Sequence, residues 1–202
     1  QGLRMGVATS TSRPTVPFDG QVISETDTDS LQVYKGSAWG QVSGLVLIKT
    51  QVIGSAVSSV AVTSVFSTTY DTYKVVINGG VGSTNQNLDL KLGSTTTGYY
   101  QSGYNTTYAG TITGQGSANA ASFGGVGVYN TNIITFNCEI LNPFTAEETL
   151  INAFRIDPTT TGGTQMVNGY LNNQTSYTDF TLTPASGTIT GGTIFVYGYA
   201  KA

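Results

Sequence analysis

The sequence predicts an all-β protein, an antiparallel and jelly-roll-like β-sandwich preceded by a small β-meander. Three observations support this fold class. Turn-forming residues recur roughly every 8 to 15 residues, the segments between them often alternate apolar with polar side chains, and no segment has the period of a long amphipathic helix. A chain of 202 residues is long enough for one sandwich and an appendage.

The chain is expected to divide into an N-terminal part, residues 1–43, and a C-terminal part, residues 44–202. Pro14 and Pro17 lack a backbone N–H, so the chain should stay extended and unpaired before the meander begins. A meander of about 25 residues buries too little apolar surface to be stable alone, so we expect it to serve as a connector. An extended arm is expected at residues 1–13, and the meander strands at residues 21–24, 31–35 and 38–42.

The C-terminal part is expected to contain about ten to twelve strands. The clearest is Leu88–Leu92, in which three leucines should face the core while Asp89 and Lys91 face outward. The last strand, Thr188–Ala200, is apolar on both faces, so one face can fill the core while the other needs a partner. The other strands are expected at residues 45–53, 57–66, 73–78, 99–113, 123–129, 132–141, 149–157, 164–171 and 177–183.

The composition argues against several classes of function. Charged residues make up 9% of the chain and the formal net charge is −3, whereas nucleic-acid binding requires clustered cations. No apolar run approaches the roughly 20 residues of a membrane-spanning helix. Because the sequence contains no histidine, Ser-His-Asp and Cys-His catalysis and histidine metal sites are excluded. We therefore expect no nucleic-acid partner and no membrane insertion.

The candidate catalytic residues are few, and each has a simpler interpretation. Cys138 is the only cysteine and alternates with apolar residues, so it is expected to be a buried thiol. Glu147 and Glu148 are adjacent, so in an extended segment they point to opposite sides and do not flank a glycosidic bond together. We expect no catalytic residue in this chain.

Metal and cofactor sites are not expected either. The acidic hairpin tip at residues 25–30 carries Glu25, Asp27 and Asp29, but it lacks the glycine and the closing glutamate of a calcium-binding loop. A solvated tip is the simpler interpretation. Trp39, the only tryptophan, is expected to dock the meander rather than to bind a ligand.

The run from Arg13 to Val42, RPTVPFDGQVISETDTDSLQVYKGSAWGQV, resembles a short module of bacteriophage virion proteins, mainly tail and head fibres and minor tail proteins. In that family the module precedes a terminal β-domain. Residues 186–201, SGTITGGTIFVYGYAK, are similar, more loosely, to the end of such domains. The resemblance implies a structural protein on the exterior of a phage particle, joined to other virion proteins through its N-terminal segment, without enzymatic activity.

Two groups of aromatic residues are candidate binding surfaces. Tyrosines interleaved with amide and hydroxyl side chains suit stacking on sugar rings and hydrogen bonding to their hydroxyls, although they also suit an ordinary β-surface or a subunit interface. The glycan-binding candidates are Tyr99, Tyr100, Tyr104, Asn105 and Tyr108, and the candidates for an oligomer interface are Phe195, Tyr197 and Tyr199 on the doubly apolar last strand.

The functional prediction is a non-enzymatic phage virion protein that forms a homotrimer, either a tail fibre or a receptor-binding tip that attaches the particle to the host surface. A host-surface glycan is a candidate partner. A head fibre or a capsid decoration protein is the first alternative. A polysaccharide-binding module or depolymerase is the second. What precedes the N-terminal arm in the full protein would discriminate a fibre shaft from a short anchor, and cleavage of host glycan would identify a depolymerase.

Overall fold

A computed structural model describes residues 5–42 and 44–200 of the chain, and within these residues the secondary structure consists of strands without a helix. The expected fold class is confirmed. Contacts divide the chain into two compact units, one that extends to Val46 and one that starts at Leu47, whereas the sequence predicts a boundary after residue 43. The described residues include no helix that is long and apolar enough to cross a membrane.

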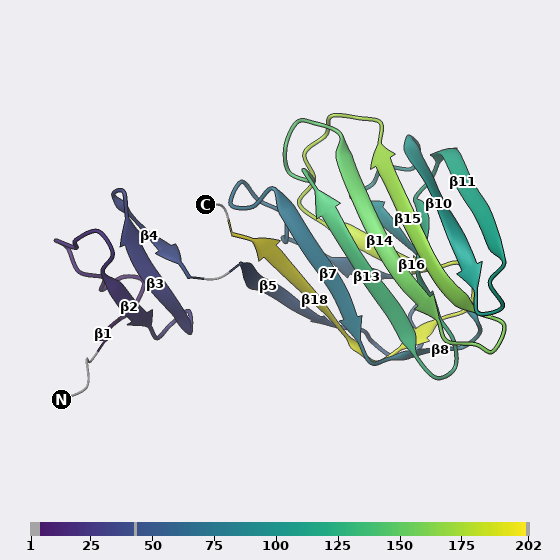
Figure 1. The fold of residues 1–202 in the computed structure, drawn as a ribbon, viewed down its shortest axis with the longest axis horizontal. Coiled ribbons are helices and arrows are strands. Elements are labelled where there is room, and N and C mark those ends of the chain that lie inside the picture. The colour runs from purple at the N-terminus through teal and green to yellow at the C-terminus, as the bar shows by residue number, and fades with distance from the viewer. Residues whose placement is uncertain (1–4, 43, 201–202) are drawn as a thin grey trace. The chain divides into compact units, whose positions relative to one another are not determined.

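The first unit is a four-stranded mixed sheet (Figure 1). The three strands of the expected meander are present, each within one residue of its predicted bounds. The expectation of an unpaired arm is wrong over residues 6–8, because these residues form an additional strand that pairs in parallel with the first meander strand. Residues 1–4 of the expected arm lie outside the described residues. The strands are β1 (Gly6–Ala8), β2 (Val22–Glu25), β3 (Ser30–Lys35) and β4 (Ala38–Gln41), in the order β1-β2-β3-β4.

An ion pair between a partly exposed arginine and a buried carboxylate helps to hold the first unit together. Arg13 donates from Nε to Oε1 of Glu25 at 2.6 Å and from Nη2 to Oε2 at 3.0 Å, and the Thr28 hydroxyl donates to Oε2 at 2.7 Å. The hydrogen bonds from Arg13 lower the pKa of Glu25, which is only 1% exposed. The expected solvated tip is therefore wrong for Glu25.

Trp39 packs edge-to-face on Tyr34 with ring centroids 5.4 Å apart.

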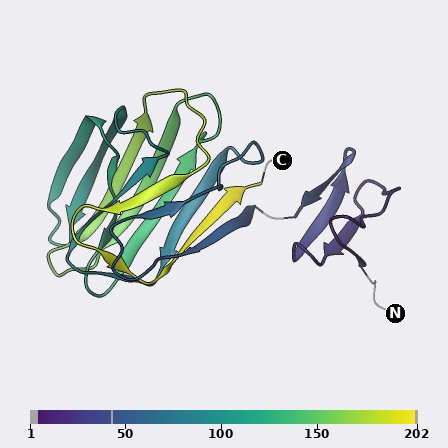
Figure 2. The ribbon, with the colours of Figure 1, turned by 180° about the vertical axis from the view of Figure 1, so that it is seen from behind.

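The second unit is a sandwich of two sheets that lie face to face (Figure 1 and Figure 2). The strands of the larger sheet, which we call the large sheet, follow the order β11-β10-β15-β14-β13-β7-β18-β5. Their bounds are β5 (Leu45–Val52), β7 (Thr72–Asn78), β10 (Tyr99–Thr107), β11 (Ile112–Ala120), β13 (Ile134–Leu141), β14 (Thr149–Asp157), β15 (Gly163–Leu171) and β18 (Thr193–Tyr199).

The second sheet is smaller and shares a strand with the first. Residues 134–136 of β13 pair with β12, whereas residues 137–141 pair with β7, so β13 links the two layers. From β13 the small sheet continues in the order β12-β9-β16-β6, and a separate two-stranded ladder joins β8 and β17. The remaining bounds are β6 (Val60–Val62), β8 (Val81–Gly82), β9 (Gln86–Leu92), β12 (Phe123–Tyr129), β16 (Phe180–Pro184) and β17 (Ile189–Thr190).

The core of the second unit lies between the two sheets. Leu88, Leu90 and Leu92 are fully buried there, as the alternation of β9 predicts. Cys138 is also fully buried, and this burial raises the pKa of its thiol to about 12. Asp89 faces away from the leucines, but it accepts a hydrogen bond from the Gly125 N–H at 2.8 Å, and burial raises the pKa of its carboxyl. The predicted outward orientation of Asp89 is confirmed, and the side chain is partly rather than fully exposed.

Candidate functional site on the outer face of the large sheet

The face of the large sheet that points away from the small sheet carries a continuous line of polar side chains. Residues directly opposite each other on antiparallel strands project to the same side of a sheet. The strand registers therefore align one residue from each of six neighbouring strands, β10, β15, β14, β13, β7 and β18. This polar row consists of Ser102, Asn168, Asn152, Glu139, Lys74 and Tyr197.

Apolar and aromatic side chains flank the polar row on both sides. The register places Tyr104, Met166 and Phe154 in line on one side of it. Tyr170 and Leu150 lie on the other side. Phe154 and Tyr104 are 45% and 46% exposed, and Leu150 is 43% exposed. Contiguous exposed apolar surface of this kind commonly marks an interaction site.

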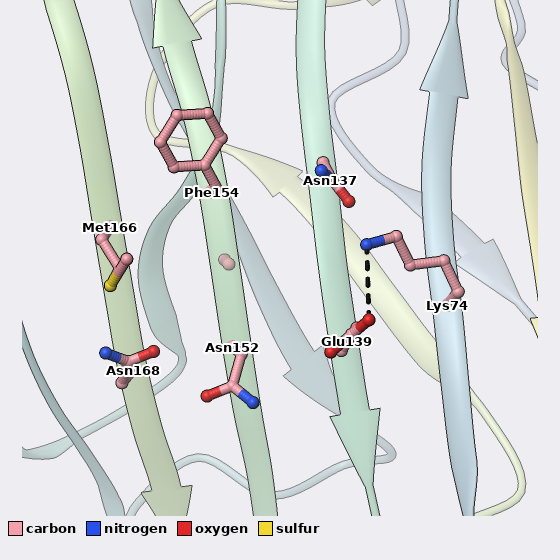
Figure 3. A pocket seen from close by; sticks show the side chains of 8 residues that line it. Lys74, Asn137, Glu139, Asn152, Phe154, Met166 and Asn168 are labelled. Atoms are coloured by element: carbon pink, nitrogen blue, oxygen red, sulfur yellow. Dashed lines mark ion pairs between the residues drawn. The ribbon is translucent and has the colours of Figure 1, made fainter.

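A depression of about 310 Å³ lies along the polar row (Figure 3). Asn152, Asn168, Glu139 and Lys74 lie along its length, and the Phe154 ring projects beside them. The full lining consists of Lys74, Asn137, Glu139, Asn152, Ala153, Phe154, Met166 and Asn168. We call it the first depression.

A second depression of about 220 Å³ adjoins the first, because Asn168 lines both. It lies beside the stacked rings of Tyr100 and Tyr170, whose centroids are 5.2 Å apart with an interplanar angle of 15°. Its lining consists of Tyr100, Gln101, Ser102, Ser117, Asn168, Gly169 and Tyr170.

The charged groups of the first depression balance each other. Nζ of Lys74 lies 3.6 Å from Oε1 of Glu139, and the hydroxyl of Tyr199 donates to the same oxygen at 2.5 Å. That hydrogen bond raises the pKa of Tyr199, because ionisation of the phenol would break it. Oδ1 of Asn137 is buried and has no hydrogen-bond partner among the described residues. The lining therefore offers amide groups and one neutralised ion pair.

This arrangement suits binding more than catalysis. Amide side chains donate and accept hydrogen bonds, and aromatic faces stack on flat apolar surfaces such as the faces of sugar rings. Glycoside hydrolysis usually requires two carboxyl groups on either side of the bond, whereas Glu139 is the single carboxylate in the lining of the first depression. Residues 5–42 and 44–200 contain no group of three or more His, Cys, Asp or Glu residues placed to hold a metal ion.

The structure separates the five residues that the sequence proposes for glycan binding. Tyr100 and Tyr104 lie on the outer face of β10, whereas Asn105 lies on the opposite face of that strand. Tyr108 follows β10, is 59% exposed, and donates from its hydroxyl to the carbonyl oxygen of Asp157 at 3.1 Å. The segment is a strand within the sheet rather than a loop at one end of the sandwich.

The assignment of Tyr99 to a binding surface is wrong. Tyr99 is fully buried, and its ring packs edge-to-face on Phe123 with centroids 4.8 Å apart. Its hydroxyl accepts a hydrogen bond from the Leu92 N–H at 2.9 Å and donates to the carbonyl oxygen of Thr95 at 3.2 Å. Burial raises the pKa of Tyr99 to about 12. Tyr99 therefore helps to fill the core and satisfies backbone groups there.

The two faces of β18 follow the predicted alternation. Ile194 and Val196 are fully buried, and Phe195, Tyr197 and Tyr199 lie half-buried on the outer face. The rings of Phe195 and Tyr197 are stacked with centroids 6.4 Å apart. A subunit interface at these three aromatic residues stays a prediction.

Sequence reasoning missed the contributions of β14 and β15 to this face. Asn152 and Phe154 come from β14, and Met166, Asn168 and Tyr170 come from β15. The signal was present in β14, whose outward residues include Leu150, Phe154 and Ile156. This strand is apolar on both faces, as β18 is, and the same argument applied to it predicts an outer face that needs a partner.

Comparisons with known proteins found no match to this chain. No protein-family model matches it, and neither a curated protein nor a solved structure matches it. The function is therefore inferred from the residues and their geometry.

Proposed function

We propose that this chain is a non-enzymatic structural protein of a phage virion, a tail fibre or receptor-binding tip that attaches the particle to glycan on the host surface. The observation that carries the proposal is the outer face of the large sheet, where a polar row with balanced charge runs between exposed aromatic and apolar side chains. Such a face combines the stacking and hydrogen-bonding groups that uncharged sugars require.

The organisation of the chain supports a connector followed by a displayed domain. The run from Arg13 to Val42 resembles the module that precedes terminal β-domains in phage fibres and minor tail proteins. The unit that contains this run exposes large apolar side chains, with Val7 72%, Val16 90% and Phe18 68% exposed. These residues offer a surface on which other virion proteins can pack.

Trimerisation on the exterior of the particle is part of the same proposal. Only 9% of the residues are charged, so packing chain against chain costs little desolvation of ionic groups. The half-buried aromatic residues Phe195, Tyr197 and Tyr199 are the proposed contacts between copies.

A head fibre or capsid decoration protein is the second candidate. The exposure of Val16 and Phe18 favours it as much as it favours a fibre, because a short anchor on a shell also needs an apolar contact surface. A depolymerase is less well supported than a binding protein, because Glu139 in the first depression already pairs with Lys74 and Tyr199.

Electron microscopy of particles from the source culture, labelled with antibodies against the purified chain, tests the proposal. We expect label on the particle surface, at the tail for a fibre or tip and on the shell for a decoration protein. Purified chain should also compete with particles for adsorption to host cells. Particles that contain the chain in an internal position, or that carry none of it, would contradict the proposal.

A further inference from the structure

We infer that the polar row binds an extended, uncharged oligosaccharide that lies across the strands and occupies both depressions at once. This inference rests on the proposed function, because it specifies the glycan and the way in which the outer face would hold it. The proposed site is an elongated binding track across the sheet, not a pocket for a single terminal sugar.

The two depressions are continuous with each other. Asn168 lines both depressions, so they form one track from Tyr100 and Ser102 to Lys74. This track crosses β10, β15, β14, β13 and β7, which lie side by side (Figure 1). Neighbouring strands are about 4.8 Å apart, so four spacings extend over roughly 19 Å. One strand spacing is close to the length that a pyranose ring adds to a linear chain, so the track accommodates about four sugars.

The same side-chain chemistry repeats along the track. Asn168 and Asn152 lie directly opposite each other on β15 and β14, and both are exposed. Each amide has donors and an acceptor, which suits hydroxyl groups that recur at every sugar. Phe154 projects beside the row in the first depression, and Tyr100 stacks on Tyr170 beside the second. Aromatic surface therefore accompanies the amides at both positions.

The opposite charges in the lining of the track are paired with each other. Among the residues that line the two depressions, Lys74 and Glu139 are the charged pair, and they lie 3.6 Å apart. The single cation in the lining, Lys74, is already paired with Glu139. An acidic glycan that approached Lys74 would also approach the Glu139 carboxylate, which would repel it. Uncharged hydroxyls meet no such repulsion. At the Lys74 end, the buried Oδ1 of Asn137, which also lines the first depression, has no hydrogen-bond partner among the described residues.

Calorimetric titration of the purified full chain tests the inference. The probes are ladders of one to six sugars from neutral α-linked and β-linked glucose polymers and from N-acetylglucosamine polymers, with oligogalacturonic acid as the acidic comparison. We expect affinity for at least one neutral ladder to increase with each added sugar up to about four and then to level off. Because the interaction involves no net charge, salt should change this affinity little.

Asn168→Ala is the informative variant, because Asn168 lines both depressions. It should lower the affinity for four-sugar probes roughly three- to tenfold and remove most of the gain from the third and fourth sugars. Thr164→Ala is the matched control, since Thr164 lies on the same strand and face but outside both depressions. It should leave the length dependence unchanged. Far-ultraviolet circular dichroism of both variants verifies that they fold.

Several results would overturn the inference while leaving the proposed function standing. They are affinity that levels off at one or two sugars, binding restricted to oligogalacturonic acid, equal losses in the two variants, and adsorption of the chain to host cells without binding to any ladder. Self-association that buries Phe154 between copies would also overturn it. Absence of both ladder binding and adsorption to host cells would remove the proposed attachment function as well.

Discussion

The inner and outer faces of the large sheet come from the same strands, yet their side chains have different surroundings. On the inner face, Ile140, Ile151 and Val196 are at most 1% exposed and pack against the small sheet. On the outer face, their immediate neighbours in sequence include Asn152 and Tyr197, which belong to the polar row. The inner face therefore stabilises the fold, and the outer face carries the proposed binding function.

The difference shows that apolar residues on an alternating strand do not all serve the core. Phe154 and Leu150 are nearly half exposed, whereas Ile151 is buried. Burial of Phe154 and Leu150 therefore contributes less to the stability of the fold than burial of Ile151 does. A partner bound in the first depression, which Phe154 lines, would remove that ring from water. We therefore expect substitutions on the inner face to alter the free energy of unfolding, and substitutions on the outer face to alter binding.

The largest expected effect is the protection of the inner-face thiol. Burial raises the pKa of Cys138 to about 12, so at pH 8 the folded state contains far less thiolate than an exposed cysteine would. A disulfide reagent such as Ellman's reagent should react with the native chain only as it unfolds, and rapidly in denaturant. Because the thiolate forms more readily in the unfolded chain, stability should fall as the pH rises from 9 toward 12. Rapid reaction of the native chain would show that this face opens.

The next effect separates two neighbouring residues on β14. Ile151→Ala leaves a cavity on the inner face and should lower the free energy of unfolding by about 2–5 kcal/mol. Asn152→Ala changes an exposed outer side chain and should alter it by less than about 0.5 kcal/mol. Denaturant unfolding of the two variants gives both values. Similar costs would mean that the outer face is also packed against something in solution.

A smaller effect is expected from the ion pair on the outer face. Glu139→Gln removes a partly exposed charge pair, so it should change the free energy of unfolding by no more than about 1 kcal/mol. It should also bring the pKa of Tyr199 back toward 10.0, because the carboxylate acceptor that raises it is lost. In the parent chain, the stability from this bond is present below pH 10 and is lost as the pH rises through the raised pKa. Ultraviolet titration of the tyrosines measures the shift, and an unchanged titration would exclude this hydrogen bond in solution.

Local alternation was enough to predict much of the fold. The pattern of Leu88, Leu90 and Leu92 identified an inner face, and the doubly apolar β18 was correctly divided into buried and outward residues. The same reasoning failed for Tyr99, which is buried and forms hydrogen bonds with the backbone of Leu92 and Thr95. The sequence alone does not distinguish such a tyrosine from an exposed one.

The site itself was beyond the reach of local patterns. The polar row joins residues from Lys74 to Tyr197, and its alignment depends on the registers of five long-range strand pairs. A shift of one residue in any of these registers would move that strand's side chains to the other face. The parallel pairing of β1 was also missed, because three residues carry no alternation that distinguishes a strand from an extended arm.

The most direct test of the central claim compares Phe154→Ala with Leu150→Ala. The two residues lie on the same strand and face with nearly equal exposure, but only Phe154 lines the first depression. Adsorption of each purified variant to host cells should be measured beside its free energy of unfolding. We expect Phe154→Ala to weaken adsorption about tenfold per site while both variants lose less than about 1 kcal/mol of stability. Unchanged adsorption of a folded Phe154→Ala chain, or equal losses in both variants, would contradict the account.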